Sequence, residues 1–211
     1  DLFRPGNSPK APQYNSKLVS AAEAPKKWED LFDPRWKGQI AMTQDLKPWF
    51  MLALGEGGWG IEKTDAYLAK LKLQQPIWAP SHTTAQSLLM AGEFKMQVDG
   101  NVYQVLQRQD KGMPIGWARV SPLPVSGAVM MLPKGPHLNA ARLFIEWLFS
   151  PQGLVTYERI TFYGVVAPGS GTRLAKALEG LETVYETEEL IEKTANTGLA
   201  EKFAKTLGIT K

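Results

Sequence analysis

The stretch that decides the fold runs from Pro25 to Met42 and reads PKKWEDLFDPRWKGQIAM. Large apolar residues recur in it at spacings of three and four, which places them on one face of a helical turn: Trp28, Leu31, Phe32 and Trp36. Asp33-Pro34 and Lys37-Gly38 then end the turn, because proline lacks an N–H donor and glycine favours a chain reversal. The sequence therefore predicts a helical turn, docked into a core by two tryptophans, that feeds a strand over residues 39–43.

The composition indicates a globular chain of one large or two small domains. The 211 residues are 44% hydrophobic and 21% charged, so a sizeable core can form. The net charge is only +3, and no run of basic residues is longer than Lys26-Lys27. A nucleic-acid surface needs a clustered basic stripe, so we expect no nucleic-acid partner.

Several classes of catalytic or metal chemistry lack their residues. The sequence has no cysteine, which excludes thiolate catalysis, thiolate metal ligation and disulfides. It also has no nucleophile elbow, phosphate-binding loop, zinc-protease helix or dinucleotide fingerprint. We therefore predict that the protein is not an enzyme and uses no cofactor.

Predicted strands alternate with predicted helices, which indicates an α/β protein with a mixed sheet flanked by helices. Residues 1–13 are rich in proline and glycine and are expected to form an irregular arm. An apolar run at 127–132 is expected to be a buried strand, and a single long helix is expected over 187–205.

Four stretches, taken in order, resemble bacterial extracellular solute-binding proteins, the type II periplasmic receptors of ABC importers, in the branch that includes ferric-iron-binding proteins. The stretch at 25–42 resembles the family's P-x-T-W-x-D-L-x-D-P-x-W-K-G-K-I pattern. It is preceded by YNSKLV at 14–19, which resembles Y-N-x-K-L-V. LMAGEF at 89–94 with GNVY at 100–103, and NAARLFIEWLFSPQG at 139–153, resemble two later family segments.

The resemblance implies two α/β lobes with the ligand between them. Residues 14–124 are then expected to form the second lobe, and residues 125–211 a returning segment that is part of the first lobe with C-terminal helices. Pro122-Leu123-Pro124 is a candidate hinge. Because the Y-N-x-K-L-V segment comes so early here, the resemblance also implies that the usual opening part of lobe one is not in this sequence.

The resemblance further implies capture of a small solute, delivered to an ABC permease in the membrane, by a periplasmic or extracytoplasmic protein. Hinge closure around the solute is the implied mechanism, and a monomer is expected for the full-length protein. A sensor module that reports ligand to a chemoreceptor or kinase is an alternative, and an enzyme is a third.

Helix starts carry the main candidate ligand groups. Ser81 and Thr83 precede or open one predicted helix, and Asn101 precedes another. Hydroxyl groups and free amides at a helix N-terminus bind anions, although the same side chains also serve as plain caps. Two such ends in one cleft would suit a carboxylate, phosphate or phosphonate, so we expect an anionic solute.

Other candidates follow strand ends or line the expected cleft. Asp45 and Trp49 follow the first predicted strand, where ligands of open α/β sheets bind, but they also suit a cap and a core residue. Ser126 and Tyr163 lie where the returning segment is expected to pass the cleft.

Tyr103 is the candidate for a ferric ligand. Iron-binding relatives present two adjacent tyrosines at this segment, but here Val102 stands in the first position. Tyr103 is thus either a single ligand contact or a packing residue at a helix start. His82 and His137 are far apart in sequence and are expected to be loop residues, so we predict no other metal site.

Overall fold

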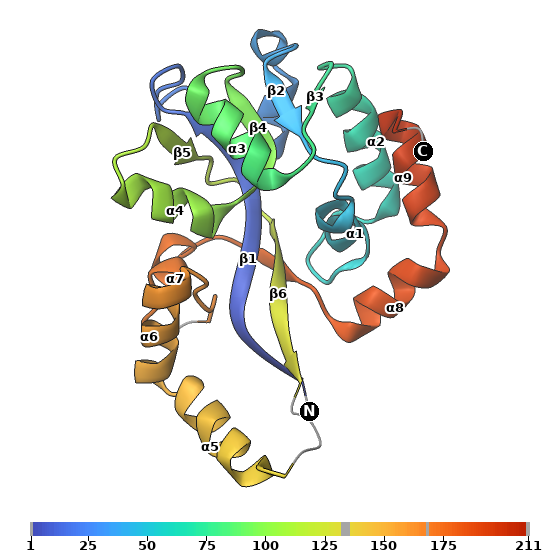
Figure 1. Cartoon of the computed structure of the whole chain (residues 1–211). Coiled ribbons are helices and arrows are strands. Elements are labelled where there is room, and N and C mark those ends of the chain that lie inside the picture. Colours follow the sequence, from blue (N-terminus) through green and yellow to red (C-terminus); the bar gives the residue numbers. More distant parts are fainter. Residues whose placement is uncertain (1, 132–135, 168, 210–211) are drawn as a thin grey trace. The chain divides into compact units, whose positions relative to one another are not determined.

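In the computed structural model, residues 2–131, 136–167 and 169–209 are described, and they form two compact units (Figure 1). The large unit comprises Pro9–Val125 and Leu181–Lys211, and the small unit comprises Asp1–Ser8 and Ser126–Gly180. Two strands contribute residues to both units: β1 (Leu2–Asn15) and β6 (Leu123–Met131).

The remaining elements belong to one unit each. The elements of the large unit are η1 (Trp28–Phe32), η2 (Pro34–Trp36), β2 (Ile40–Met42), α1 (Lys47–Leu54), α2 (Ile61–Lys72), β3 (Ile77–Trp78), α3 (His82–Ala91), β4 (Met96–Asn101), α4 (Val102–Asp110), β5 (Ile115–Trp117), β7 (Thr183–Tyr185), α8 (Glu188–Asn196) and α9 (Leu199–Leu207). Those of the small unit are α5 (Leu138–Leu148), α6 (Pro151–Thr161) and α7 (Arg173–Ala177).

The strands form a mixed sheet, as predicted. Within the described residues their order is β3-β2-β4-β1-β6-β7, and β5 also pairs with β1. β2 runs parallel to β3 and β4, whereas β1 runs antiparallel to β4 and β5. The register between β1 and β4 shifts between Ala11 and Gln13, and such irregularities redirect side chains.

The stretch at 25–42 folds as predicted. Trp28 is 2% exposed, and its ring lies edge-on to Trp49 and Trp59, with centroids 6.0 and 5.7 Å away. Its indole N–H donates to the carbonyl of Pro122 at 2.9 Å, and its own carbonyl accepts from the hydroxyl of Tyr67 at 2.8 Å. The turn therefore ties α1, α2 and the start of β6 together, and β2 follows it directly.

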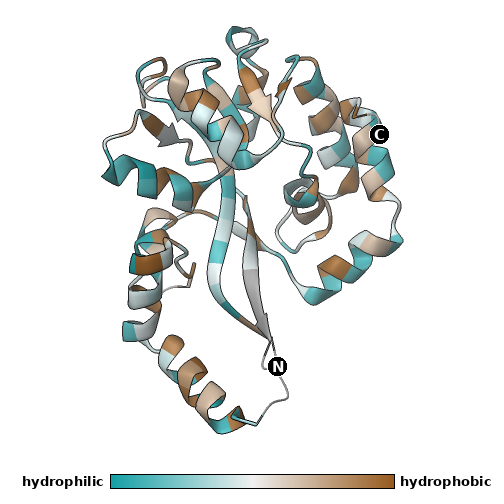
Figure 2. Cartoon of the chain, viewed as in Figure 1, coloured by the Kyte–Doolittle hydropathy of each residue, from teal (hydrophilic) through white to brown (hydrophobic). Residues whose placement is uncertain are grey.

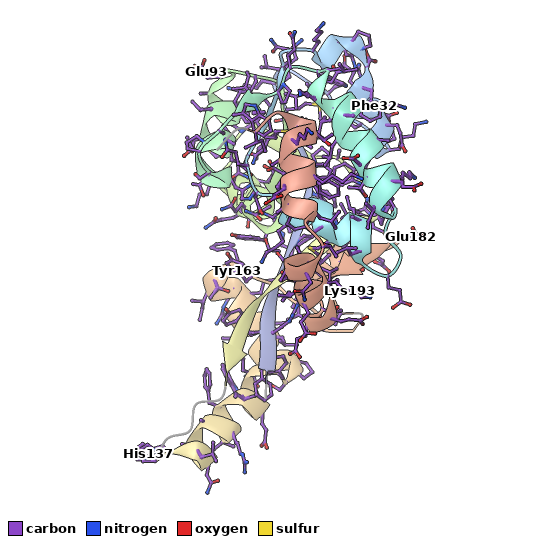
Figure 3. The ribbon with its side chains drawn as sticks, turned by 90° about the vertical axis from the view of Figure 1, so that its right-hand side faces the viewer. Phe32, Glu93, His137, Tyr163, Glu182 and Lys193 are labelled. Atoms are coloured by element: carbon purple, nitrogen blue, oxygen red, sulfur yellow. The ribbon has the colours of Figure 1, made fainter. Side chains whose placement is uncertain are left out.

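Phe32 ends this turn and packs on α2 (Figure 3). Its ring centroid lies 4.8 Å from that of Tyr67. The amide of Gln74, just after α2, donates to the Phe32 carbonyl at 2.9 Å. The second predicted tryptophan, Trp36, is also buried, and its indole donates to the Asp30 carbonyl at 3.0 Å.

The C-terminal residues pack with the large unit. Phe203 on α9 is fully buried and stacks on Phe50 of α1, with centroids 5.8 Å apart. Thr206 donates to the carboxylate of Asp65 on α2 at 2.7 Å, so α9 lies along α2 (Figure 1). Residues 181–211 thus group with residues 9–125 in the compact large unit, because the buried side chains of α9 pack on α1 and α2.

Two further expectations are corrected by backbone geometry. The helix expected over 187–205 is split into α8 and α9, because Gly198 adopts a left-handed conformation with φ of +62°. Residues 1–13 are almost entirely strand rather than an irregular arm. Their prolines suit extended backbone, and within the small unit Asn7 donates its N–H to the Gly164 carbonyl at 2.8 Å.

In the small unit, α5 and α6 follow one another closely within residues 138–161. Ser150 caps α6 by accepting from the N–H of Gly153 at 3.1 Å, and Pro151 follows at the first helical position. Polar and apolar residues alternate along both helices (Figure 2). The strand expected at 127–132 is β6 up to Met131, and residue 132 lies outside the described residues.

No helix among the described residues combines the length and the hydropathy needed to cross a membrane.

Trp28, Trp49, Trp59 and Tyr67, which we call the Trp28 cluster, give the first prediction. We expect Trp28→Ala to lower the free energy of unfolding by about 3–5 kcal/mol, because it leaves a cavity among Trp49, Trp59 and Tyr67 and removes a buried hydrogen bond. Urea denaturation measures the loss. Trp147→Ala is the matched control, because Trp147 is 43% exposed and should cost far less. Equal losses in the two variants would contradict the central role of Trp28.

Candidate functional site

A group of charged side chains is gathered around Lys10 of β1 in the large unit. The Lys10 ammonium Nζ lies 2.8 Å from Nε2 of His82 and 3.8 Å from Oδ2 of Asp45. The same His82 nitrogen lies 3.1 Å from that Asp45 oxygen. Three elements thus meet here: β1, the loop after β2 and the first residue of α3.

Asp99 of β4 also belongs to this group. Its Oδ2 accepts from the N–H and the hydroxyl of Thr43, at 3.0 and 2.5 Å, and lies 3.7 Å from Nδ1 of His82. Asp99 and Thr43 are both buried. We call Lys10, Asp45, His82 and Asp99 the charged cluster.

The local folding rules explain why these residues meet. Asp45 and Asp99 lie at or just beyond the carboxyl ends of parallel strands β2 and β4, the edge at which open α/β sheets bind ligands. α3 and α4 both begin at this edge. Ser81 caps α3 by accepting from the N–H of Thr84 at 3.1 Å, and Asn101 stands at the N-cap position of α4. Lys10 pairs in register with Asn101, so its ammonium group comes from a strand beside both helix starts.

A buried chain of side-chain amides holds the start of α4. Arg108 Nε donates to Gln86 Oε1, Gln86 Nε2 donates to Gln13 Oε1 at 2.8 Å, and Gln13 Nε2 donates to the Asn101 carbonyl at 2.9 Å. Gln13 lies directly over Gly100, where a Cβ would come within 2.1 Å of its amide carbon. Glycine at this position is therefore required by the close approach of Gln13.

The charged side chains shift one another's pKa values. Burial lowers the pKa of Lys10 below its ordinary value, and the carboxylates of Asp45 and Asp99 offset part of this effect. Burial alone would raise the pKa of Asp45, but the hydrogen bond with His82 and the charge of Lys10 outweigh it. The pKa of Asp45 is consequently below its ordinary value. Asp45 is ionised at neutral pH and faces a cation that is held away from water.

Three buried polar atoms of this region have no hydrogen-bond partner within the part of the chain that the structure describes. They are Oδ1 of Asp99, Oε1 of Gln97 and Nδ1 of His82. Buried polar atoms are normally paired, so a water molecule or a solute can pair with these atoms. Among the described residues, no group of three or more His, Cys, Asp or Glu side chains has the arrangement of a metal site.

Two cavities of the large unit lie away from the charged cluster. One, of about 640 Å³, is formed by Leu54–Gly57 and by residues of β7 and α8, among them Lys193, which extends from α8 (Figure 3). The other, of about 700 Å³, lies along residues 22–35. Neither includes a residue of the cluster, so cavity volume alone does not locate the polar chemistry.

Residues 5–178 match the profile of the family described as bacterial extracellular solute-binding protein. The chain belongs to this family. The predicted family, the α/β fold and the periplasmic or extracytoplasmic location of a solute-binding protein are thereby confirmed. No curated protein matches the chain in sequence.

Solved structures of solute-binding proteins share the fold. A substrate-binding protein of an ABC transporter from Agrobacterium tumefaciens aligns with a TM-score of 0.71 at 11% identity, over 98% of this chain and 66% of its own. An extracellular solute-binding protein from Bordetella parapertussis aligns with a TM-score of 0.73 at 15% identity, over 99% of this chain and 68% of its own. A Bordetella ferric binding protein aligns with a TM-score of 0.70 at 16% identity, over 99% of this chain and 70% of its own. This chain therefore spans about two thirds of the length of each.

The structure brings four predicted site residues to one edge of the large unit. Asp45 belongs to the charged cluster, Ser81 and Thr83 stand at the start of α3, and Asn101 stands at the start of α4. The two helix starts are linked, because Gln104 lies within 3.5 Å of both the Thr83 hydroxyl and the Asn101 amide.

The other four predicted residues are placed differently. Tyr103 is the second residue of α4 and is buried. Trp49 is 1% exposed and packs against Trp28 and Tyr67, so its role is that of a core residue. Ser126 and Tyr163 belong to the small unit, where the Ser126 hydroxyl donates to the Ser8 carbonyl at 3.4 Å and the Tyr163 N–H donates to Thr161 at 3.2 Å.

Lys10, His82 and Asp99 of the charged cluster were not among the predicted site residues. Lys10 stood in a stretch expected to be irregular, and His82 was expected to be a loop histidine, although it opens α3. Asp99 lies within the short strand β4. Its signal was present, because Gln97, Asp99 and Asn101 put polar groups at every second position of a strand that is buried throughout.

Asp45 gives a prediction on pH. A carboxylate whose pKa is lower in the folded than in the unfolded chain stabilises the fold above its ordinary pKa, here 3.8, and loses that contribution as the pH falls through the folded value. The free energy of unfolding should therefore fall more steeply from about pH 5 to pH 3 in the wild type than in Asp45→Asn. Denaturant titrations at each pH measure the difference, and parallel curves would contradict it.

Proposed function

We propose that the protein captures a small solute outside the cytoplasm for an ABC importer, and that the solute binds at the charged cluster. Family membership supports the general role. The observation that carries the location is the Lys10 ammonium, which is 6% exposed and stands beside the starts of α3 and α4. A buried cation at two positive helix ends favours the arrival of an anion.

The solute has an anionic group, such as a carboxylate, phosphate or phosphonate. The hydroxyls of Ser81 and Thr83 and the first amides of α3 form one set of donors, and Asn101 and the first amides of α4 form the other. Lys10 adds the positive charge between them. Loss of water around the bound anion strengthens each of these interactions.

Closure of the two lobes is the proposed mechanism of capture. Residues 14–124 form the second lobe in this proposal, and residues 125–211 form the returning segment. Closing the lobes excludes water from the bound solute. The solute shifts the equilibrium toward the closed form to the extent that it binds that form more tightly than the open one. The closed receptor then delivers the solute to a membrane permease.

No observation on the described residues favours ferric iron over an anionic solute. One of the similar structures is a ferric binding protein, but here the residue before Tyr103 is Val102, which is fully buried. A hard ferric ion needs several anionic oxygen ligands at one point. We therefore assign the site to a small organic or inorganic anion.

A titration followed by NMR tests the proposal. In ¹H–¹⁵N spectra of the chain, acetate and phosphate should shift the amides at the starts of α3 and α4, whereas a neutral sugar should not. Lys10→Met should weaken binding of the anions by about tenfold or more, because a charge-assisted hydrogen bond is lost.

Lys17→Met is the matched control, because Lys17 is exposed and outside the cluster, and it should bind as the wild type does. Thermal melting shows whether each variant is folded. Anion binding that Lys10→Met leaves unchanged, or an equal response to the neutral sugar, would overturn the proposed site.

A further inference from the structure

The charged cluster contains one more carboxylate than it contains permanent cations. Lys10 contributes one positive charge, and Asp45 and Asp99 contribute two negative charges. Lys47 also acts on Lys10, but its ammonium group is paired with Glu186 at 3.0 Å, so this ion pair leaves the balance unchanged. Either a proton on His82 or a cation from outside can balance the remaining charge. An anionic solute alone would bind here with a second negative charge in an already acidic group.

His82 is poorly placed to balance both neighbours. Its Nε2 lies 2.8 Å from the Lys10 ammonium, which can only donate, and 3.1 Å from the Asp45 carboxylate, which can only accept. One ring nitrogen cannot accept from the first and donate to the second at the same time. A donor from outside the chain at Asp45 would leave Nε2 to accept from Lys10.

Asp45 is the member of the cluster that is open to solvent. Its side chain is 35% exposed, compared with 8% for Lys10 and 0% for Asp99. A solute that reaches the cluster from solvent therefore meets an ionised carboxylate before it meets the ammonium group. The partly exposed Asp45 carboxylate attracts a cation, while Lys10 stands beside the helix starts that attract the anion.

Two deeply buried acceptors strengthen this point independently. Asp99 is 1% exposed and Gln97 is 0% exposed, and each has a side-chain oxygen without a donor among the described residues. Both side chains end against His82: Asp99 Oδ2 lies 3.7 Å from its Nδ1, and Gln97 Nε2 lies 3.5 Å from its carbonyl oxygen. Both unpaired oxygens are acceptors, and Nδ1 of His82 is an unpaired donor when Nε2 accepts from Lys10, so unpaired acceptors outnumber unpaired donors on this side of the cluster.

We propose that the solute is a zwitterion, in which an ammonium group binds Asp45 and a carboxylate or phosphonate binds the starts of α3 and α4. This inference rests on the proposed function and names its substrate class. Asp45 is then the residue that selects for the amine. The solute's cation balances the surplus charge of the cluster, while its anion meets the helix ends.

Matched probes test this assignment in the 211-residue chain. Dissociation constants are measured by NMR titration for two sets: β-alanine, propionate and propylamine, and γ-aminobutyrate, butyrate and butylamine. In at least one set the zwitterion should bind about tenfold or more tightly than either singly charged analogue. Asp45→Asn should abolish this preference for the amine, because the amide lacks the charge that attracts the ammonium group.

Asp110→Asn is the control, because Asp110 is exposed at the far end of α4, and it should keep the preference. If propionate and butyrate bind as tightly as the amino acids, the inference is overturned and the proposed anion site stands. If the amines alone bind as tightly as the amino acids, the anionic half of the proposed function is wrong. If no probe binds, both are overturned.

Discussion

The burial of one lysine constrains the whole edge of the large unit. Moving an ammonium group out of water is costly unless opposite charges and hydrogen bonds accompany it. Lys10 therefore needs Asp45 from the loop after β2, Asp99 from β4 and His82 from the start of α3. These residues in turn need their strands in the observed register, and Asp99 needs the N–H and hydroxyl of Thr43. The site therefore depends on the strand register as much as on the residues that form it.

The packing on either side keeps this arrangement rigid. The Trp28 cluster joins η1, α1 and α2, while the amide chain through Gln13 and Gln86 fixes the start of α4 from within. The side chains of Trp28, Gln13 and Gln86 in these two arrangements are neutral and hydrogen-bonded, so they hold the site without adding charge to it. A solute then meets charged groups whose positions are set before it arrives, which reduces the entropy lost on binding.

Local patterns in the sequence predicted local structure well. The turn at Trp28 and the cap at Ser81 each depend on residues a few positions apart, and both are present. The pairing of Lys10 with His82 spans 72 positions and that of Thr43 with Asp99 spans 56, so neither follows from spacing. Asp45, Ser81, Thr83 and Asn101 were found because loops at strand ends are a general place for ligands. The buried residues that give those loops their charge depend on strand register and could not be predicted.

The central claim is that polar recognition takes place at the charged cluster rather than in the larger cavities. Hydrogen–deuterium exchange of the chain, with and without saturating γ-aminobutyrate, tests it most directly. The account predicts slower exchange in the segments that carry the cluster and the helix starts, residues 43–47, 81–84 and 99–103. Slower exchange confined to Leu54–Gly57 and Thr183–Lys193, which line the cavity beside α8, would contradict it.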